Sequence, residues 1–523
     1  MFFLKRRKLS NFCPFCRNVV LTISLYKKAG GGFLATENIL QEFADLDRIF
    51  DPKSIAIIGV SSEGPGFGRS IFVSHRSIGY EGKLYPVNKR GGSIEGTNIY
   101  PSIEAIPDKI DFAIIAVPAH LVPSALEACR SKGAVGAEIL SSGFSETGTP
   151  EGIALEEELK TIAKKGIRII GPNCFGIYCP KSGLTMLPGP DLSRKPGSVA
   201  LLSQSGGLSV DFGYIGKWKG IHFSKVVSFG NGCDLRETEM LRYLRHDPET
   251  RVICMYIEGV SDGRDFFTAL KEVAAEKPVI IIKGGLSESG SRAAASHTAS
   301  LGGNKVIWEA ALRQCHVTQV ENLEEMSDVA LAFSLLPPRE YKGCAVMGGG
   351  GALGIAAADT AESFGIKVPS LRKDLQEAIL EVLPKPGSSA TNPVDIANPY
   401  VSPKYIREIL LHASQDENID FHIVIQLLYH YKALQLNLGN VKLGEITPYK
   451  ELAKVCREAM DIGKKPVMLI LPNIRRDEDD LEIEEVNRET RRLFTEAGMP
   501  VFDSVKNAFN AVASISRYYL YHR

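Results

Sequence analysis

Short runs of β-branched and aliphatic residues alternate with helix-like stretches along the chain from residue 54 onward. The runs form three sets: 54–60, 83–87, 112–117, 136–140 and 167–170, then 198–202, 225–229, 252–257 and 278–283, and finally 344–347, 422–427, 466–471 and 500–502. Strands that alternate with helices predict parallel sheets of the α/β class. Each run of the first set ends in a turn rich in Gly, Pro, Ser or Asn, where open α/β sheets bind ligands.

The second and third sets open in the same way. Residues 199–202 lead into Ser203-Gln204-Ser205-Gly206-Gly207, and residues 345–347 lead into a run of four glycines at 348–351. Both segments have the pattern of a strand, a loop of small residues and a helix N-terminus. The repetition predicts two related flavodoxin-like domains. The stretch Pro337-Pro338-Arg339 is typical of a linker.

Composition narrows the class of protein. The 523 residues are 44% hydrophobic and 23% charged with a net charge of zero, so we expect no nucleic acid or membrane surface as partner. Ten cysteines spread over so long a chain favour reduced thiols and a cytoplasmic location. No apolar run reaches the roughly 18 residues of a membrane span.

Residues 1–44 differ from the rest of the chain. The first 36 residues hold seven Lys or Arg and no acidic residue, which predicts a disordered basic tail or an over-extended start. Cys13 and Cys16 form one C-x-x-C pair, but the segment offers no two further ligands for zinc. A metal role for this pair is therefore not favoured.

The turn after the first run has features of a phosphate-binding loop. Gly59, Val60, Ser61 and Ser62 follow a buried strand and precede a helix, so their backbone N–H groups could hold a pyrophosphate. The spacing is not G-x-G-x-x-G, so an ordinary strand-to-helix turn is the alternative. The second run ends in Asn88-Lys89-Arg90, whose charges suit a ribose phosphate, as in CoA or NADP, and disfavour NAD.

Seven motifs in order resemble one family. They are 54–61 (SIAIIGVS), 85–88 (YPVN), 116–119 (AVPA), 142–146 (SGFSE), 171–174 (GPNC), 203–206 (SQSG) and 296–298 (SHT). From about residue 45 to the C-terminus the chain resembles the NDP-forming (ADP-forming) acyl-CoA synthetases, relatives of the succinyl-CoA synthetase α subunit. The resemblance implies a Rossmann-like CoA-binding domain at 45–185. Two flavodoxin-like domains would follow, at 186–337 and 338–523.

The resemblance also assigns roles to particular residues. CoA would be bound by nine of them: Gly59, Val60, Ser61, Ser62, Lys89, Val117, Pro118, Ser142 and Gly143. The site of thioester and phosphate chemistry would be bordered by eight: Gly171, Pro172, Asn173, Cys174, Ser203, Gln204, Ser205 and Gly206. We do not expect a catalytic thiol at Cys174, because the sequence shows nothing that would lower its pKa.

His297 lies in a run of small residues, which suits a loop that must carry a phosphoryl group between two places. Imidazole is a suitable phosphoryl acceptor near neutral pH. By the resemblance His297 is the phosphohistidine and Glu258, at the end of the run 252–257, is the carboxylate that supports it. Neither residue would need a metal. A solvated strand-end Glu258 is the alternative, and Asn392-Pro393-Val394-Asp395 is explained by a structural turn with an Asx hydrogen bond.

The family's reaction converts acyl-CoA, ADP and phosphate reversibly into carboxylic acid, CoA and ATP. The transfer to ADP requires Mg²⁺ and an ATP-grasp domain, for which the chain leaves no room after residue 392, so we expect an ATP-grasp β-type partner subunit in a hetero-oligomer. Two alternatives stay open: a CoA-binding or acyl-sensing protein without catalysis, and an NADP-dependent oxidoreductase. The sequence does not reveal which small carboxylic acid is used.

Overall fold

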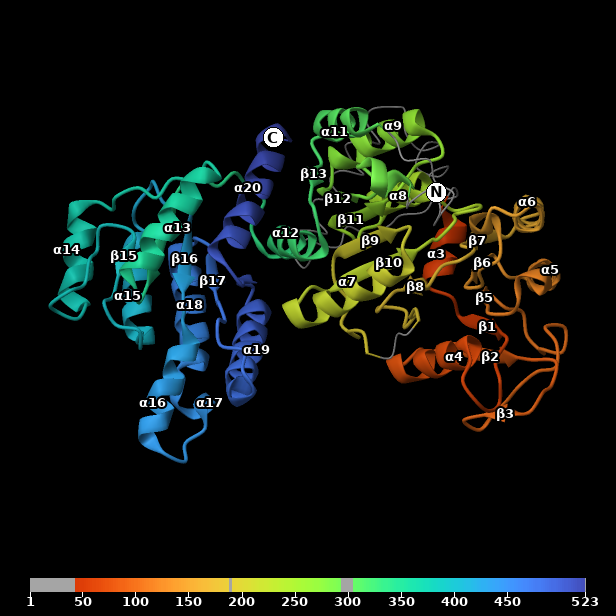
Figure 1. Cartoon of the computed structure of the whole chain (residues 1–523), viewed down its shortest axis with the longest axis horizontal. Helices are drawn as coiled ribbons and strands as arrows, with labels where there is room; N and C mark the ends of the chain where they lie inside the picture. Colours follow the sequence, from red (N-terminus) through yellow and green to blue (C-terminus); the bar gives the residue numbers. More distant parts are fainter. Residues whose placement is uncertain (1–42, 188–190, 293–303, 523) are drawn as a thin grey trace, which may run out of the picture.

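The computed structural model describes residues 43–187, 191–292 and 304–522 (Figure 1). Three sheets with parallel strands follow one another along this part of the chain, and helices pack against them. The α/β class predicted from the sequence is confirmed. No helix among the described residues is long and apolar enough to cross a membrane.

The first sheet has the strand order β2-β1-β5-β6-β7, with all neighbours parallel. Its strands are β1 (Ser54–Ile58), β2 (Lys83–Val87), β5 (Phe112–Ile115), β6 (Gly136–Ile139) and β7 (Arg168–Ile170), and β3 (Ser93–Ile94) and β4 (Thr97–Asn98) form a separate ribbon. Its helices are α3 (Ala44–Phe50), α4 (Phe67–Ile78), α5 (Val122–Ser131) and α6 (Pro150–Ala163), with 3₁₀ turns η2 (Ala119–Leu121) and η3 (Ser145–Thr147).

Both faces of this sheet are buried, as an all-parallel sheet requires. Along β1, Ile55 and Ile57 join the apolar cluster that includes α4, whereas Ala56 and Ile58 join the cluster of α5 and α6. The β1 segment is aliphatic at successive positions because helices cover both faces of the sheet.

The second sheet has the order β13-β12-β11-β9-β10-β8. Its parallel strands are β9 (Val199–Ser203), β10 (Phe223–Ser228), β11 (Val252–Ile257), β12 (Val279–Lys283) and β13 (Thr318–Gln319), covered by α7 (Gly206–Lys219), α8 (Glu237–His246), α9 (Gly263–Ala274), α11 (Lys305–Gln314) and α12 (Leu323–Leu335). The edge strand β8 (Gly176–Tyr178) is antiparallel to β10 and follows directly on the last turn of the first sheet. Neither β8 nor β13 was predicted from the sequence.

The third sheet has the order β15-β14-β16-β17-β18. Its strands are β14 (Cys344–Gly348), β15 (Val394–Asp395), β16 (Phe421–Ile425), β17 (Val467–Ile470) and β18 (Val501–Phe502). Its helices are α13 (Gly351–Ser363), α14 (Lys373–Val382), α15 (Pro403–Ala413), α16 (Tyr431–Leu438), α17 (Leu443–Ile446), α18 (Tyr449–Gly463), α19 (Leu481–Glu496) and α20 (Val505–Tyr521), with η4 (Leu428–His430) and η5 (Glu478–Asp480). Numbered along the chain, the parallel strands of each sheet run 2-1-3-4-5, the flavodoxin order.

The first two sheets are joined by polar and aromatic contacts. The Phe50 ring of α3 stacks on Tyr243 of α8 at 5.2 Å between centroids, and the Tyr243 hydroxyl donates to Asp47 at 3.0 Å. Arg168 of β7 donates to both oxygens of Glu239 at 2.7 Å. These contacts fix the first sheet against the second.

Helices α12 and α20 lie between the second and third sheets in Figure 1. A buried ion pair joins Lys219, at the end of α7, to Asp328 of α12 at 2.5 Å. Asn507 of α20 donates to the same Asp328 carboxylate at 2.7 Å. The third sheet is thus attached through a buried polar network as well as apolar packing.

Candidate functional site

The turn after β1 fits a phosphate-binding loop. Gly59 has φ +101°, and a Cβ there would collide with the Ala116 carbonyl. Helix α4 begins behind this turn with Gly66 as its N-cap, no side-chain cap and no acidic residue in its first turn. The Ser61 hydroxyl is buried and has no hydrogen-bond partner among the described residues. Free donors at a helix N-terminus suit the phosphates of CoA.

The predicted basic turn lies at the adjacent strand end. Lys89 and Arg90 are exposed, and neither makes an ion pair within the described part of the chain. Sequence reasoning missed Arg69 of α4, whose guanidinium donates to the Ser61 carbonyl at 3.3 Å and also to the Ser62 carbonyl. Arg69 thereby ties the phosphate loop to α4. The position of Arg69 just after the glycine-rich turn could have indicated this role from the sequence.

The other predicted CoA residues lie together at the ends of β5 and β6. The Ser141 hydroxyl donates to the Val117 carbonyl, and Pro118 and Ser142 are exposed next to them. Gly143 donates its N–H to the Glu146 carboxylate at 2.6 Å. The carboxyl ends of four neighbouring strands therefore gather the predicted CoA contacts along one edge of the first sheet.

The loop Gly171–Cys174 connects the ends of the first and second sheets. The Asn231 N–H donates to the Pro172 carbonyl at 3.0 Å, and the Cys233 N–H donates to the Gly171 carbonyl at 2.9 Å. Asn231 follows β10, so these bonds place the ligand edges of both sheets against one loop. We call residues 171–174 the junction loop.

Asn231 was not singled out in the sequence. Its side-chain amide donates to Glu146 at 2.6 Å and to Glu156 at 3.0 Å, and its oxygen accepts from Asn173 at 3.4 Å. One side chain of the second sheet thus holds the CoA-side turn and the junction loop together. The signal was the Gly230-Asn231-Gly232 turn after a predicted strand.

Cys174 lies on the inner side of the junction loop. The side chain is 2% exposed and its thiol donates to the Ile139 carbonyl at 3.3 Å. Burial, reinforced by nearby Glu138, raises the pKa of the thiol well above its ordinary value. A protonated, enclosed thiol is a poor nucleophile.

Glu138 of β6 lies beneath the same loop and is 1% exposed. Its Oε2 accepts the Ile177 N–H at 3.0 Å, and its Oε1 has no partner among the described residues. Burial raises the pKa of this carboxyl group to about 8. Burial therefore favours the protonated, neutral form of Glu138.

The predicted segment Ser203–Gly206 forms the turn between β9 and α7. The Ser203 hydroxyl donates to the Ser205 carbonyl at 2.8 Å, and Ser205 caps α7 by accepting the Leu208 N–H at 3.4 Å. A Cβ at Gly206 would lie 2.6 Å from the Phe175 ring. Phe175 follows the junction loop directly, so the start of α7 and this loop are in contact.

Glu258 follows β11 at the same edge of the second sheet and is 5% exposed. Gln204 accepts the N–H groups of Glu258 and Gly259 through one oxygen, the latter at 3.1 Å. The Tyr256 hydroxyl donates to the Glu258 carboxylate at 3.1 Å. His297, Cys13 and Cys16 lie outside the described residues.

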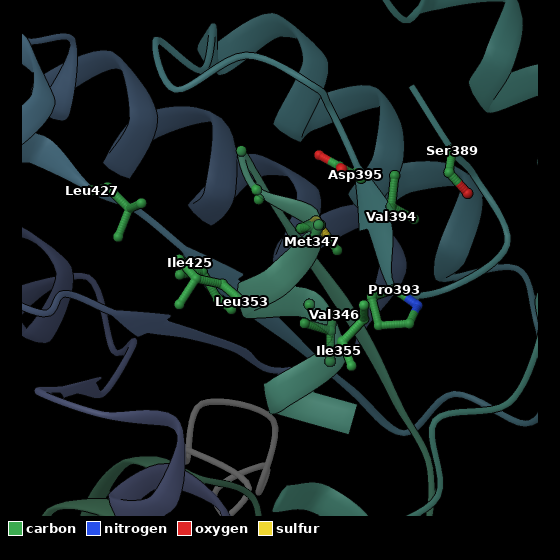
Figure 2. A pocket seen from close by; sticks show the side chains of 15 residues that line it. Val346, Met347, Leu353, Ile355, Ser389, Pro393, Val394, Asp395, Ile425 and Leu427 are labelled. Atoms are coloured by element: carbon green, nitrogen blue, oxygen red, sulfur yellow. The ribbon is translucent and has the colours of Figure 1, made fainter. Parts of the chain in front are cut away.

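The third sheet has its own cavity of about 210 Å³ (Figure 2). It is lined by the glycines 348–351 and by apolar side chains such as Leu353, Ile355 and Ile425. A Cβ at Gly351 would lie 3.0 Å from the Asp395 carboxylate, which also accepts the Ala397 N–H at 2.8 Å as in an Asx turn. The start of α13 thus faces an acidic side chain of the chain itself, whereas α7 is capped by a neutral hydroxyl.

No cluster of three or more His, Cys, Asp or Glu side chains that could hold a metal ion occurs in the described ranges. The two loops and the two sheet edges described above suit CoA and an anion. Comparison with known proteins agrees with this chemistry. A model described as a CoA binding domain matches residues 53–180, and one described as a succinyl-CoA ligase like flavodoxin domain matches residues 196–333.

The fold and these two matches define a CoA-binding protein with a succinyl-CoA ligase like flavodoxin domain. The α subunit of the ADP-forming acetate–CoA ligase I of Pyrococcus furiosus is 36% identical over 482 residues, which are 90% of this chain and 97% of that relative. The ADP-forming acetate–CoA ligase I of Archaeoglobus fulgidus is 34% identical over 474 residues, and the match covers 90% of this chain and 64% of that longer relative.

A solved structure agrees with these relatives. The dinucleotide-forming acetyl-coenzyme A synthetase 1 of Candidatus Korarchaeum cryptofilum, in complex with phosphate and ADP, superposes with a TM-score of 0.75 at 30% identity, covering 90% of this chain and 96% of that chain. The chain belongs to the family of ADP-forming acyl-CoA synthetases and is of the α-subunit type. The family expected from the seven motifs is thereby confirmed.

Proposed function

We propose that this chain performs the acyl-CoA half of the reaction at the junction loop and passes the phosphoryl group on through His297. Phosphate attacks the thioester carbonyl and forms an acyl phosphate, while the carbon–sulfur bond breaks and CoA leaves as the thiol. An imidazole nitrogen of His297 then attacks phosphorus, and the carboxylate leaves as the free acid. The observation that supports this proposal best is the contact of the CoA-side turns, the junction loop and the Glu258 edge.

Individual residues have assigned parts in this proposal. The nine predicted CoA residues, from Gly59 to Gly143, bind CoA, with Lys89 at its ribose phosphate. The junction loop and Ser203–Gly206 surround the reacting thioester, where the N–H groups that start α7 would meet an anion. Glu258 accepts a hydrogen bond from the imidazole and supports its positive charge as the nitrogen–phosphorus bond forms.

The phosphoryl group then passes to ADP. We propose that an ATP-grasp β-type subunit binds ADP and Mg²⁺ and takes the phosphoryl group from His297 in a hetero-oligomer. The α-subunit relative and the relative that is longer than this chain support this division of labour. We propose the domain limits 45–185, 186–337 and 338–523 after a tail at 1–44, with β8 at 176–178 crossing from the first segment to complete the second sheet. We also propose a cytoplasmic location, since the eight described cysteines are all free thiols.

The proposed substrate is a small carboxylic acid, with acetate as the first to test because both relatives are acetate–CoA ligases. The test incubates the full chain with acetyl-CoA and labelled phosphate, with and without an ATP-grasp partner. Acid-labile label should appear in the wild type and disappear in His297→Asn. CoA binding with no label under any partner condition would instead indicate a CoA-binding protein without catalysis.

A further inference from the structure

Lys283 is a buried cation at the ligand edge of the second sheet. It ends β12 after four apolar residues, and its side chain is 6% exposed. Among the described residues it forms no ion pair with a carboxylate within 4.0 Å. Burial of an ammonium group is strongly unfavourable unless its protons find good acceptors. The acceptors that hold the Lys283 ammonium group therefore determine what this residue can do.

One of the hydrogen bonds of Lys283 is to the backbone of Glu258. The Lys283 ammonium donates to the Glu258 carbonyl at 2.7 Å and to the Gly284 carbonyl, and it lies 4.9 Å from the centre of the Trp308 ring. The pairing of β11 with β12 places Ile257 opposite Lys283, so the two strand ends lie side by side. Burial lowers the pKa of Lys283 to about 8, although nearby Glu258 opposes this shift.

Among the described residues, three hydrogen bonds consequently hold Glu258. Gln204 accepts its N–H, Lys283 donates to its carbonyl, and Tyr256 donates to its carboxylate. Bonds at both sides of a residue fix the peptide planes that flank it, and the third bond sets the carboxylate oxygen. Such support is what a charged group needs in order to be presented in one geometry.

We propose that Lys283 is a positioning residue that anchors the backbone of Glu258, so that the carboxylate is presented in a fixed place to the imidazole that takes the phosphoryl group. The inference rests on the proposed function of Glu258 and His297. Lys283 acts through Glu258 and forms no covalent bond. Loss of its anchor should slow the formation of phosphohistidine and leave CoA binding unchanged.

The chain offers a matched control at the other end of β12. Lys277 donates to the Leu244 carbonyl at 2.6 Å and to the Asp247 carbonyl at 2.7 Å, and burial lowers its pKa to about 8 as well. It therefore has the same chemistry as Lys283 but lies at the opposite edge of the sheet, away from Glu258. A general loss of stability should be similar for Lys283→Met and Lys277→Met.

The experiment measures two quantities in the full chain with an ATP-grasp partner: the rate of labelling from acetyl-CoA and labelled phosphate, and the KM for acetyl-CoA. For Lys283→Met we expect labelling to be at least about tenfold slower with KM within about twofold, because misplacement of a supporting group by about 1 Å costs up to a hundredfold. Lys277→Met should label at the wild-type rate. Equal rates for both variants would overturn the inference.

Two further variants separate the inference from the function it rests on. If Glu258→Gln labels at the wild-type rate while His297→Asn does not label, Glu258 has no role and the inference fails with it. If Glu258→Gln is slow and Lys283→Met is not, only the inference fails. Should Lys283→Met not fold, the same labelling assay is made on Lys283→Gln, which removes the charge but keeps a polar side chain, and a wild-type rate for that variant would overturn the inference.

Discussion

Replacement of Glu138 by Gln should make stability less dependent on pH. The folded state raises the pKa of this carboxyl from 4.5 to about 8, so the folded chain binds its proton more tightly than the unfolded chain does. Stability from this group is therefore greatest below pH 4.5 and falls as the pH rises towards 8. The loss is about 1.4 kcal/mol per pH unit, which amounts to about 3 kcal/mol at pH 7.

Gln keeps an oxygen that can accept the Ile177 N–H, and it does not ionise. The stability of the variant should therefore not decrease with pH through this side chain. The assay is thermal or denaturant unfolding of wild type and Glu138→Gln at pH 5, 6, 7 and 8, with the difference between them as the quantity of interest. The free energy of unfolding of the variant, relative to that of the wild type, should increase with each pH unit. Glu157→Gln, on the exposed side of α6 with a side chain 64% exposed, is the control and should show no such trend.

A difference between wild type and Glu138→Gln that stays constant from pH 5 to pH 8 would refute the reasoning. It would mean that the Glu138 carboxyl is not neutral in the folded state, because only a change of protonation on folding makes stability depend on pH in this range. The proposed function would be unaffected by that result.

Two other predictions concern binding and chemistry. Lys89→Glu should weaken CoA by about tenfold to a hundredfold but dephospho-CoA much less, as calorimetry at two salt concentrations can show; equal losses would mean that this turn does not bind the ribose phosphate. Gly206→Ala should displace the Phe175 ring, whose nearest atom lies 2.6 Å from the new Cβ, and slow phosphohistidine labelling by about tenfold or more. Gly207→Ala, which meets no atom within 4 Å, is its control, and equal rates for the two variants would contradict the close packing argued for Phe175.

The sequence predicted the repeated strand and helix pattern well, because each buried parallel strand leaves a run of aliphatic residues. It missed β8, β13 and β15, which have two or three residues and are strands only because a neighbouring strand pairs with them. The predicted CoA turns do gather at one edge, since the carboxyl ends of parallel strands must meet there. The role of His297 stays a prediction.

The sequence could not predict which residues of the second sheet hold the site residues in place by hydrogen bonds. Asn231 and Lys283 stand in ordinary turn and strand-end positions, and only tertiary contacts bring them to Glu146, Glu156 and Glu258. Glu138 is a similar case, because the pKa of its carboxyl group depends on how deeply other parts of the chain bury it. Residues that act through others leave no local pattern.

The position of β8 limits where this polypeptide can be divided. A fragment that begins at about residue 186 would contain the rest of the second sheet without the strand that covers β10, because β8 at residues 176–178 would remain with the preceding fragment. The bare edge of β10 would then present unpaired N–H and C=O groups, which promotes pairing between copies and aggregation. Expression of the first two domains as separate pieces should therefore fail unless β8 is kept with the second piece, and a gene split between them would meet the same obstacle.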